Sequence, residues 1–213
     1  MRRMVPRRTR KTRMPLDEGV TLDGSLVRLV PLALEHVDAL CETGLDPAIW
    51  RWMPARVRNH DAMQALVDQA LEDQRAGTAL PFATTLRATG EVVGSTRFMN
   101  IALPHRRVEI GGTWIAPAWQ RTRINTEAKY LMLRHAFEEW KLLRVEFKTH
   151  ALNARSRAAI LRLGATEEGT LRKHIVQDDG SSRDSVYFSI LDDEWPAVKA
   201  RLEAALVSPL RTP

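Results

Sequence analysis

Residues 119–140, "WQRTRINTEAKYLMLRHAFEEW", run from a polar loop into a helix with regular apolar spacing. The first turn of a helix offers unpaired backbone N–H groups and the positive end of the helix dipole, so it can bind a phosphate. The loop contains no proline, and every N–H donor is therefore present. Arg121 and Arg123 stand where glycines are expected, and they can add charge-assisted bonds to a phosphate if φ stays negative. The alternative is a helix that Asn125 or Thr126 simply caps.

The elements that position this loop are those of one mixed α+β domain. Period-2 or short apolar runs predict strands at 25–32, 81–101 (two strands around a Thr-Gly turn), 106–116, 142–152 and 170–191 (a hairpin). Helical spacing and stop signals predict helices at 33–44, 60–77, within 119–140, at 153–164 and at 192–207. Gly111-Gly112 predicts a bulge in its strand. The strand-helix-strand passage 106–152 predicts a parallel pair, while the hairpins predict antiparallel neighbours.

Composition favours an ordinary globular protein. Apolar residues make up 44% of the 213 residues and charged residues 27%. No run approaches the ~18 apolar residues of a membrane span, so no membrane contact is expected. The single Cys41 cannot form an internal disulfide, and no Cys/His spacing suits a metal. We therefore expect a cytoplasmic protein without a metal.

The net charge of +6 comes from the N-terminus. Residues 1–15 hold seven of the 32 Lys and Arg and none of the 26 Asp and Glu, so the remainder is close to neutral. This tail is expected to be a disordered arm that contacts RNA or the ribosome, or the product of an over-extended start site with translation beginning at Met14. The domain proper is expected at 16–213, as a monomer or homodimer.

Five stretches in order and spacing resemble the GNAT superfamily of acetyl-CoA-dependent N-acetyltransferases. They are "VRLVPLALEHVDAL", "IWRWMP", "EIGGTWIAPAWQRTRINTEAKYLMLRHAFE", "NARSRAAILRLGA" and "GTLRKHIVQDDGSSRDSVYFSI". More narrowly they are similar to the RimJ/RimL type, which includes enzymes that acetylate the N-termini of ribosomal proteins. The resemblance covers residues ~22–192. It implies a single GNAT-like domain: a mixed, mostly antiparallel central sheet with a splayed parallel pair and flanking helices.

The resemblance also implies a binding site for acetyl-CoA. The family pattern Gln/Arg-x-x-Gly-x-Gly/Ala falls on 120–125, with Arg123 and Asn125 at the two glycine places. The implied pyrophosphate contacts are Gln120, Arg121, Thr122, Arg123, Ile124, Asn125 and Thr126. The backbone of Trp114 and Ile115 in "TWIAP" would pair with the pantetheine arm, and a backbone N–H there could stabilise an oxyanion. Asn153 in "NARS" would contact the same arm.

Acetyl transfer to an amine needs a base and an acid. Glu109, just before the glycine pair, is the best placed carboxylate, with His150 and His174 as runners-up. Ser156, one turn after Asn153, could protonate the departing thiolate. The structural alternatives are a solvated strand residue for Glu109 and helix capping for Asn153 and Ser156. Cys41 is far in sequence from the loop, so transfer should be direct.

The acceptor is expected between two flanking segments. Trp50, Arg51, Trp52 and Met53 in "IWRWMP" offer an apolar wall and one charge, and His174 lies on the hairpin opposite. Alternatively both tryptophans belong to the core. The expected acceptor is a protein N-terminal amine, because its pKa of about 7.7–8.0 needs only mild base help. The alternatives are a small-molecule amine, or a non-catalytic CoA- or RNA-binding protein.

Overall fold

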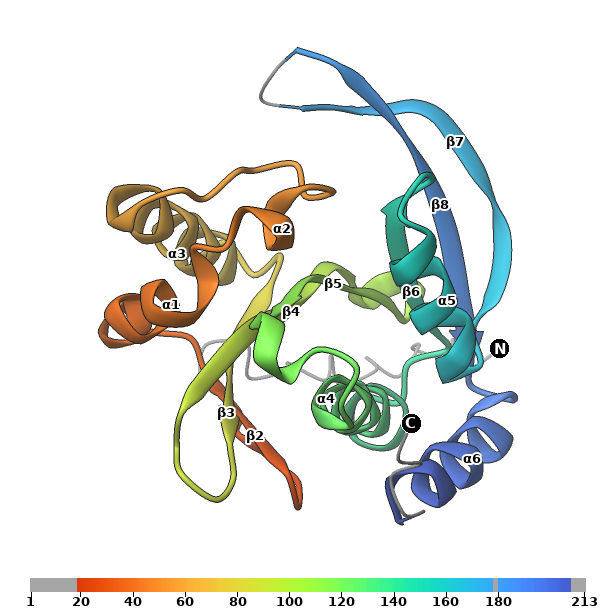
Figure 1. The fold of residues 1–213 in the computed structure, drawn as a ribbon. Coiled ribbons are helices and arrows are strands. Elements are labelled where there is room, and N and C mark those ends of the chain that lie inside the picture. Colours follow the sequence, from red (N-terminus) through yellow and green to blue (C-terminus); the bar gives the residue numbers. More distant parts are fainter. Residues whose placement is uncertain (1–18, 178–179, 208–213) are drawn as a thin grey trace, which may run out of the picture.

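The structure is a computed structural model that describes residues 19–177 and 180–207. The basic tail at 1–15 lies outside these residues, and its separation from a domain at 16–213 stays a prediction. An eight-stranded sheet runs through the described part of the chain in the order β1-β2-β3-β4-β5-β6-β8-β7 (Figure 1). The strands are β1 (Leu22–Asp23), β2 (Val27–Pro31), β3 (Leu80–Leu86), β4 (Val92–Ala102), β5 (Arg107–Ile115), β6 (Arg144–His150), β7 (Thr166–Val176) and β8 (Ser182–Leu191).

Six α-helices in the described residues flank the sheet. They are α1 (Val37–Gly44), α2 (Pro47–Trp50), α3 (His60–Arg75), α4 (Ile124–Arg134), α5 (Ala154–Leu163) and α6 (Trp195–Val207). Polar caps fix several starts: the side chains of Asp46, Asn59 and Asn153 each accept a backbone N–H from the first turn of α2, α3 and α5. Gly164 ends α5 with φ of 104°, a conformation that glycine adopts without a Cβ penalty.

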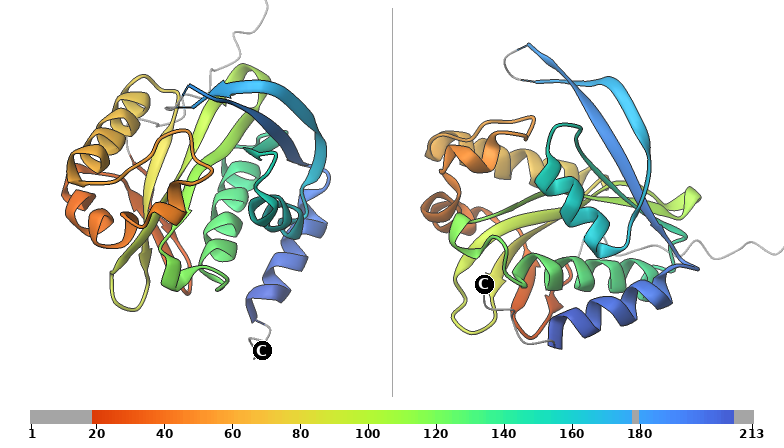
Figure 2. Two further views of the ribbon diagram at one scale, coloured as in Figure 1. Left: turned by 45° about the horizontal axis from the view of Figure 1, so that its top comes forward. Right: turned by 45° about the vertical axis from the view of Figure 1, so that its right-hand side comes forward.

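The helices divide between the two faces of the sheet. Helices α1 to α3 cover one face of its N-terminal half, and α4 to α6 lie on the other side (Figure 2). The main core fills the space under α4 to α6, with Phe82, Phe98 and Phe188 fully buried. A second apolar cluster, including Met63 and Trp114, lies under α1 to α3. The mixed α+β fold expected from the sequence is confirmed.

The parallel pair β5–β6 is short and opens into a fork. Only three residue pairs form it: the first joins Arg107 to Arg144, and the last joins Glu109 to Glu146. Beyond that point β5 continues along β4, while β6 continues along β8. The remaining neighbours in the described sheet are antiparallel, and the β7–β8 hairpin curves away from the other strands (Figure 1). The splayed pair expected from the sequence is therefore present.

A bulge in β5 follows directly after the fork. Arg97 of β4 pairs with Gly111, and Ser95 pairs with Trp114, so two β5 residues stand opposite one β4 residue. Gly112 has φ of 58°, and an added Cβ would lie 2.6 Å from Arg97 Nε. The predicted bulge at the glycine pair is confirmed. It shifts the alternation of β5, so that Trp114 lies under α1 to α3 while Ile115 lies in the main core.

Among the described residues no helix is both long and apolar enough to cross a membrane.

Candidate active site

Glu109 lies at the fork, in the last paired position of β5 and β6. Only 2% of the residue is exposed. Its Oε2 accepts a hydrogen bond from Asn100 Nδ2 at 2.8 Å and forms an ion pair with Lys148 Nζ at 3.2 Å. A Cβ added at Gly111 would lie 3.1 Å from Oε1, so the bulge glycine leaves room for this carboxylate. The solvated-strand alternative for Glu109 is wrong, and a carboxylate held here can serve as a general base.

Strand alternation gathers a polar face around Glu109. The core-facing valines and phenylalanines of β6 and β8 alternate with polar residues, which point to the other side of the sheet. We call Glu109, Lys148, His174, Arg183 and Tyr187 the polar face. The Nζ atom of Lys148 lies 5.7 Å from the centre of the Tyr187 ring, and His174 Nε2 lies 3.4 Å from the Tyr187 hydroxyl. The predicted base Glu109 and the runner-up His174 therefore share one surface.

His174 has one ring nitrogen without a partner: Nδ1 is buried and makes no hydrogen bond with the described residues. Partial burial lowers the pKa of His174, and the charges of Lys148 and Arg183 lower it further, while Glu109 opposes them. A lowered pKa favours the neutral imidazole, which can accept a proton.

Arg183 connects the polar face to the segment after α2. It is 5% exposed, and its Nη1 donates to the carbonyl oxygen of Trp52 at 2.9 Å. Its Nε is buried without a partner, and it forms no ion pair with the described residues. Burial lowers the pKa of this guanidinium, and the negative charge of Glu109 partly offsets that effect.

Arg51 and Trp52, two of the predicted acceptor residues, lie beside the polar face. The Trp52 ring meets the His150 ring edge-on at 4.9 Å, and the exposed Arg51 guanidinium lies 4.9 Å from the Trp52 ring. The Nδ1 atom of His150 accepts the backbone N–H of Leu152 at 3.1 Å. This bond leaves His150 less suited to act as a base than His174.

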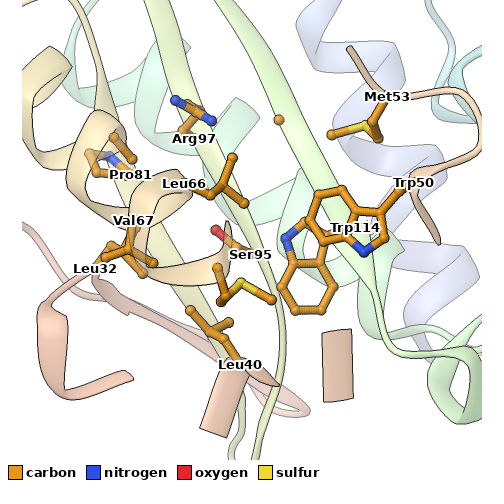
Figure 3. A pocket seen from close by; sticks show the side chains of 13 residues that line it. Leu32, Leu40, Trp50, Met53, Leu66, Val67, Pro81, Ser95, Arg97 and Trp114 are labelled. Atoms are coloured by element: carbon orange, nitrogen blue, oxygen red, sulfur yellow. The ribbon is translucent and has the colours of Figure 1, made fainter. Parts of the chain in front are cut away.

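Trp50 and Met53 belong to a more interior setting (Figure 3). Trp50 is 2% exposed, its indole N–H donates to Gly44 O at 2.6 Å, and its ring lies 5.6 Å from that of Trp114. The core alternative therefore holds for Trp50. Both residues line a cavity of about 20 Å³ that also touches Gly112, which is room for about one water molecule.

The loop before α4 is held by side-chain bonds to its own neighbours. The Gln120 amide donates to Ile115 O at 2.9 Å and accepts from Arg155 Nη1 at 2.7 Å, so it joins the end of β5 to α5. The Thr122 hydroxyl donates to Trp119 O at 2.7 Å and accepts the N–H of Ile124 at 3.3 Å. These bonds fix the loop shape and use the first-turn donor of Ile124, but not the N–H groups of Asn125 and Thr126.

The two loop arginines differ in conformation. Arg123 has φ of −77°, as phosphate binding requires, but its Nη1 donates to Leu206 O at the end of α6 at 3.0 Å. Arg121 has φ of 65°, so the expectation of a negative φ is wrong at this position. A left-handed non-glycine residue is uncommon because its Cβ crowds the following carbonyl. The exposed Arg121 side chain is the loop guanidinium that faces solvent.

The first turn of α4 is not capped as the alternative required. The N-cap residue is Arg123, which makes no side-chain capping bond, and Asn125 and Thr126 lie inside the helix. The Asn125 Oδ1 atom is buried without a partner among the described residues. A helix that Asn125 or Thr126 caps is therefore excluded.

Glu127, also in this first turn, has a structural role. Its carboxylate accepts the backbone N–H groups of Ser25, Leu26 and Val27 and the Ser25 hydroxyl, at 2.6 to 3.0 Å. A Cβ at Gly24 would lie 2.5 Å from Glu127 Oε2. This residue therefore anchors the β1–β2 turn to the helix that carries the loop.

Asn153 and Ser156 form the start of α5. The Asn153 Oδ1 atom accepts the backbone N–H of Ser156 at 3.1 Å, so the capping alternative holds for this oxygen. The Ser156 hydroxyl takes no part in that bond, and both side chains are half-buried. A capping role leaves the Asn153 amide group free to donate elsewhere.

Lys129 of α4 is a buried group that was not among the site residues expected from the sequence. It is 5% exposed, and its Nζ donates to Thr96 Oγ1 of β4 at 2.8 Å and to Thr113 Oγ1 of β5 at 2.5 Å. The Thr113 hydroxyl in turn reaches Gly111 O at 3.4 Å. Burial lowers the pKa of Lys129 to about 7. The two N–H groups of a neutral amine match the two hydroxyl acceptors at the bulge.

Signals for the missed residues exist in the sequence. Lys148 and Tyr187 alternate with core residues of their strands, so strand parity places them on the side of Glu109. Lys129, Leu133 and Ala136 follow i, i+4, i+7 spacing, which marks a buried stripe that runs along α4 into the π-helical turn His135–Glu139. No local pattern shows that Arg183 reaches the segment after α2, because that contact spans 131 positions.

No group of three or more His, Cys, Asp or Glu side chains that could hold a metal ion is found in the part of the chain that the structure describes.

Comparisons with known proteins agree with this geometry. The sequence model of the acetyltransferase (GNAT) domain matches residues 27–166. A Bacillus subtilis protein named "Putative ribosomal N-acetyltransferase YdaF" is 36% identical over 110 residues, which is 52% of this chain and 59% of that protein. The match thus spans about three fifths of the length of this relative.

Two solved structures share the fold. A GCN5-related N-acetyltransferase from Brucella melitensis superposes with a TM-score of 0.83 at 31% identity, over 92% of this chain and 88% of that one. Mycobacterium smegmatis RimJ, in complex with CoA-disulfide, gives a TM-score of 0.73 at 28% identity, over 84% and 88%. The fork, the bulge, the loop before α4 and the family match agree: this chain is an acetyltransferase that belongs to the GNAT family.

Proposed function

We propose that this protein transfers the acetyl group of acetyl-CoA directly to the α-amine of a protein N-terminus. The observation that carries the proposal is the carboxylate of Glu109, buried at the fork and facing the polar side of the sheet. An α-amine, with a pKa of about 7.7–8.0, needs only one such base, whereas lysine at about 10.4 needs stronger help. The ribosomal N-acetyltransferase and RimJ names of the relatives support a protein acceptor. We also propose that the enzyme works in the cytoplasm, which the same names support.

The N-terminus of α4 fits the pyrophosphate of acetyl-CoA. Its first-turn N–H groups at Asn125 and Thr126 have no side-chain cap, and the dipole of α4 favours an anion there. Arg121 offers an exposed guanidinium in the preceding loop, and its positive φ changes the backbone there without burying the side chain. The missing glycine at Arg123 does not oppose binding, because the backbone there has an ordinary negative φ. When bound, acetyl-CoA supplies the activated thioester.

The remaining roles fall to residues on either side of the fork. Glu109 accepts the proton of the attacking amine, and Lys148 and Asn100 hold its Oε2 in place. The Ser156 hydroxyl relays a proton from a solvent water to the departing thiolate and remains a hydroxyl, while Asn153 orients the pantetheine arm. The β5 backbone at Trp114 and Ile115 pairs with the same arm.

A binding and turnover experiment tests the proposal. Calorimetry should give micromolar affinity for acetyl-CoA, weakened in Arg121→Glu and unchanged in the control Arg87→Glu on the β3–β4 turn. Mass spectrometry should then find one acetyl group on the α-amine of a peptide that also carries an internal lysine. Acetylation of polyamines alone would favour the small-molecule alternative. Binding without turnover on any amine would favour the non-catalytic one.

A further inference from the structure

The charges of the polar face do not balance. Glu109 is paired with Lys148 at 3.2 Å, which leaves Arg183 as a second cation beside them. The carboxylate that acts on Arg183 is Glu109, already engaged. Asp184, next in the chain, accepts the backbone N–H of Lys173 at 2.7 Å instead. The guanidinium of Arg183 is thus a buried positive charge without an ion-pair partner in the described part of the molecule.

Unfilled hydrogen-bonding capacity lies on the same side of the sheet. The Nε atom of Arg183 and the Oγ of Ser185, two positions on along β8, are both buried without a partner among the described residues. Ser185 is 0% exposed. His174 Nδ1, on the neighbouring strand, is a third such atom. Buried polar atoms in folded proteins nearly always have a protein or water partner, so these three atoms can take partners from bound water or from a ligand.

The sign of the missing group follows from the donors. The Nε–H of an arginine can only donate, and a hydroxyl or imidazole can donate to the same acceptor. Carboxylate and phosphate oxygens are the acceptors that match a guanidinium best. An amine that approaches in its ammonium form would add another positive charge to this face. A carboxylate on the acceptor itself would offset the unpaired charge of Arg183.

We propose that the preferred acceptor is an acidic N-terminus, with an aspartate or glutamate at its second or third residue, and that Arg183 is the specificity-determining residue for that carboxylate. This inference rests on the proposed function, because it names the acceptor of the same site. The bond from Arg183 to Trp52 O ties the guanidinium to the segment after α2, which we expect to flank the acceptor.

The competing role for Arg183 is a purely structural tether. In that case its loss would affect every acceptor equally, because the Trp52 segment would shift for all of them. Two variants separate charge from tether. Arg183→Lys keeps the positive charge, and Arg183→Gln keeps an amide donor for Trp52 O without charge. Their comparison isolates the charge at one position.

The experiment uses the full chain and three peptides with an N-terminal serine and an amidated C-terminus. The peptides differ only at residues two and three, which are both glutamate, both glutamine or both lysine. In the wild type, kcat/KM should be about tenfold higher for the glutamate than for the glutamine peptide, which corresponds to about 1.4 kcal/mol. This lies between the roughly 1 kcal/mol of a charge pair at 4 Å in water and the roughly 4 kcal/mol at an effective dielectric constant of 20. Arg183→Lys should keep that ratio, and Arg183→Gln should bring it near one, with acetyl-CoA affinity unchanged.

If the ratio of kcat/KM for the glutamate peptide to that for the glutamine peptide is equal in the wild type and Arg183→Gln, the inference is overturned. Arg183 would then have only the structural role of holding the Trp52 segment. If the wild type binds acetyl-CoA but acetylates no peptide, the proposed function fails on its own. Calorimetric binding of the same peptides to the CoA-bound protein then decides the charge inference: tighter binding of the glutamate peptide supports it, and equal binding refutes it. A short RNA that displaces the glutamate peptide with steep salt dependence would assign the face to nucleic acid and overturn it as well.

Discussion

Lys129→Met offers the sharpest physical test of the interior. The ammonium form of Lys129 would have three N–H donors for two hydroxyl acceptors, in a site that is 5% exposed. Burial therefore lowers its pKa from 10.5 to about 7. The unfolded chain, with the ordinary pKa, binds a proton at every pH between these two values, while the folded protein does not.

The sign of the effect follows from this difference. Because the unfolded state binds more protons between pH 7 and 10.5, the free energy of unfolding should rise with pH across that window. Each pKa unit is worth about 1.4 kcal/mol, so the full effect of Lys129 is about 5 kcal/mol, as an upper bound. Below pH 7 the destabilisation is complete, and above pH 10.5 it disappears.

Urea denaturation of the wild type and Lys129→Met at a series of pH values measures the effect. The wild type should gain up to about 1.4 kcal/mol per pH unit relative to the variant between pH 7 and 9.5. The matched control is Lys141→Met at an exposed lysine, which should follow the wild type. Two parallel curves for the wild type and Lys129→Met would refute a neutral lysine at the bulge.

Four further substitutions test the loop and its supports. Arg121→Gly should stabilise the protein by about 1 kcal/mol in thermal unfolding, because glycine adopts the φ of 65° without strain. Arg123→Gly should destabilise the protein, because the φ of Arg123 is an ordinary −77°. Equal effects of the two substitutions would contradict the assigned backbone conformations. Glu127→Gln should cost about 3 kcal/mol in urea unfolding, since an amide cannot accept all four donors of the β1–β2 turn; a cost below about 1 kcal/mol would argue against that anchor. Gln120→Ala should weaken acetyl-CoA binding about fivefold in calorimetry through loss of the β5–α5 link, and unchanged affinity would remove Gln120 from the site.

The sequence was most informative where a local rule decides the structure. The Gly111-Gly112 pair predicted the bulge, because few other features place two glycines inside a strand. Asn153 and Gly164 marked the ends of α5 for the same kind of reason. The parallel pair followed from a strand-helix-strand passage, which the chain can close in only one common way.

The rest depended on contacts between distant segments. The polar face unites β5, β6, β7 and β8, so the neighbours of Glu109 could not be read from any one stretch. Arg121 was expected at negative φ because most residues avoid the left-handed region, and the tight turn at 119–123 overrode that preference. Trp50 and Trp52 lie two positions apart, yet only Trp50 is a core residue. Its indole N–H can be buried because it donates a hydrogen bond to Gly44 O.

The most direct test of the central claim compares two carboxylates that are partners in the β5–β6 register. Glu109→Gln should lower kcat for an N-terminal peptide by about 10² to 10⁴, the range for loss of a general base, with acetyl-CoA affinity retained. Glu146→Gln, whose carboxylate pairs with Arg107 and Arg144, should change kcat by less than about threefold. Equal kcat in Glu109→Gln and the wild type would contradict the assignment of Glu109 as the base at the fork.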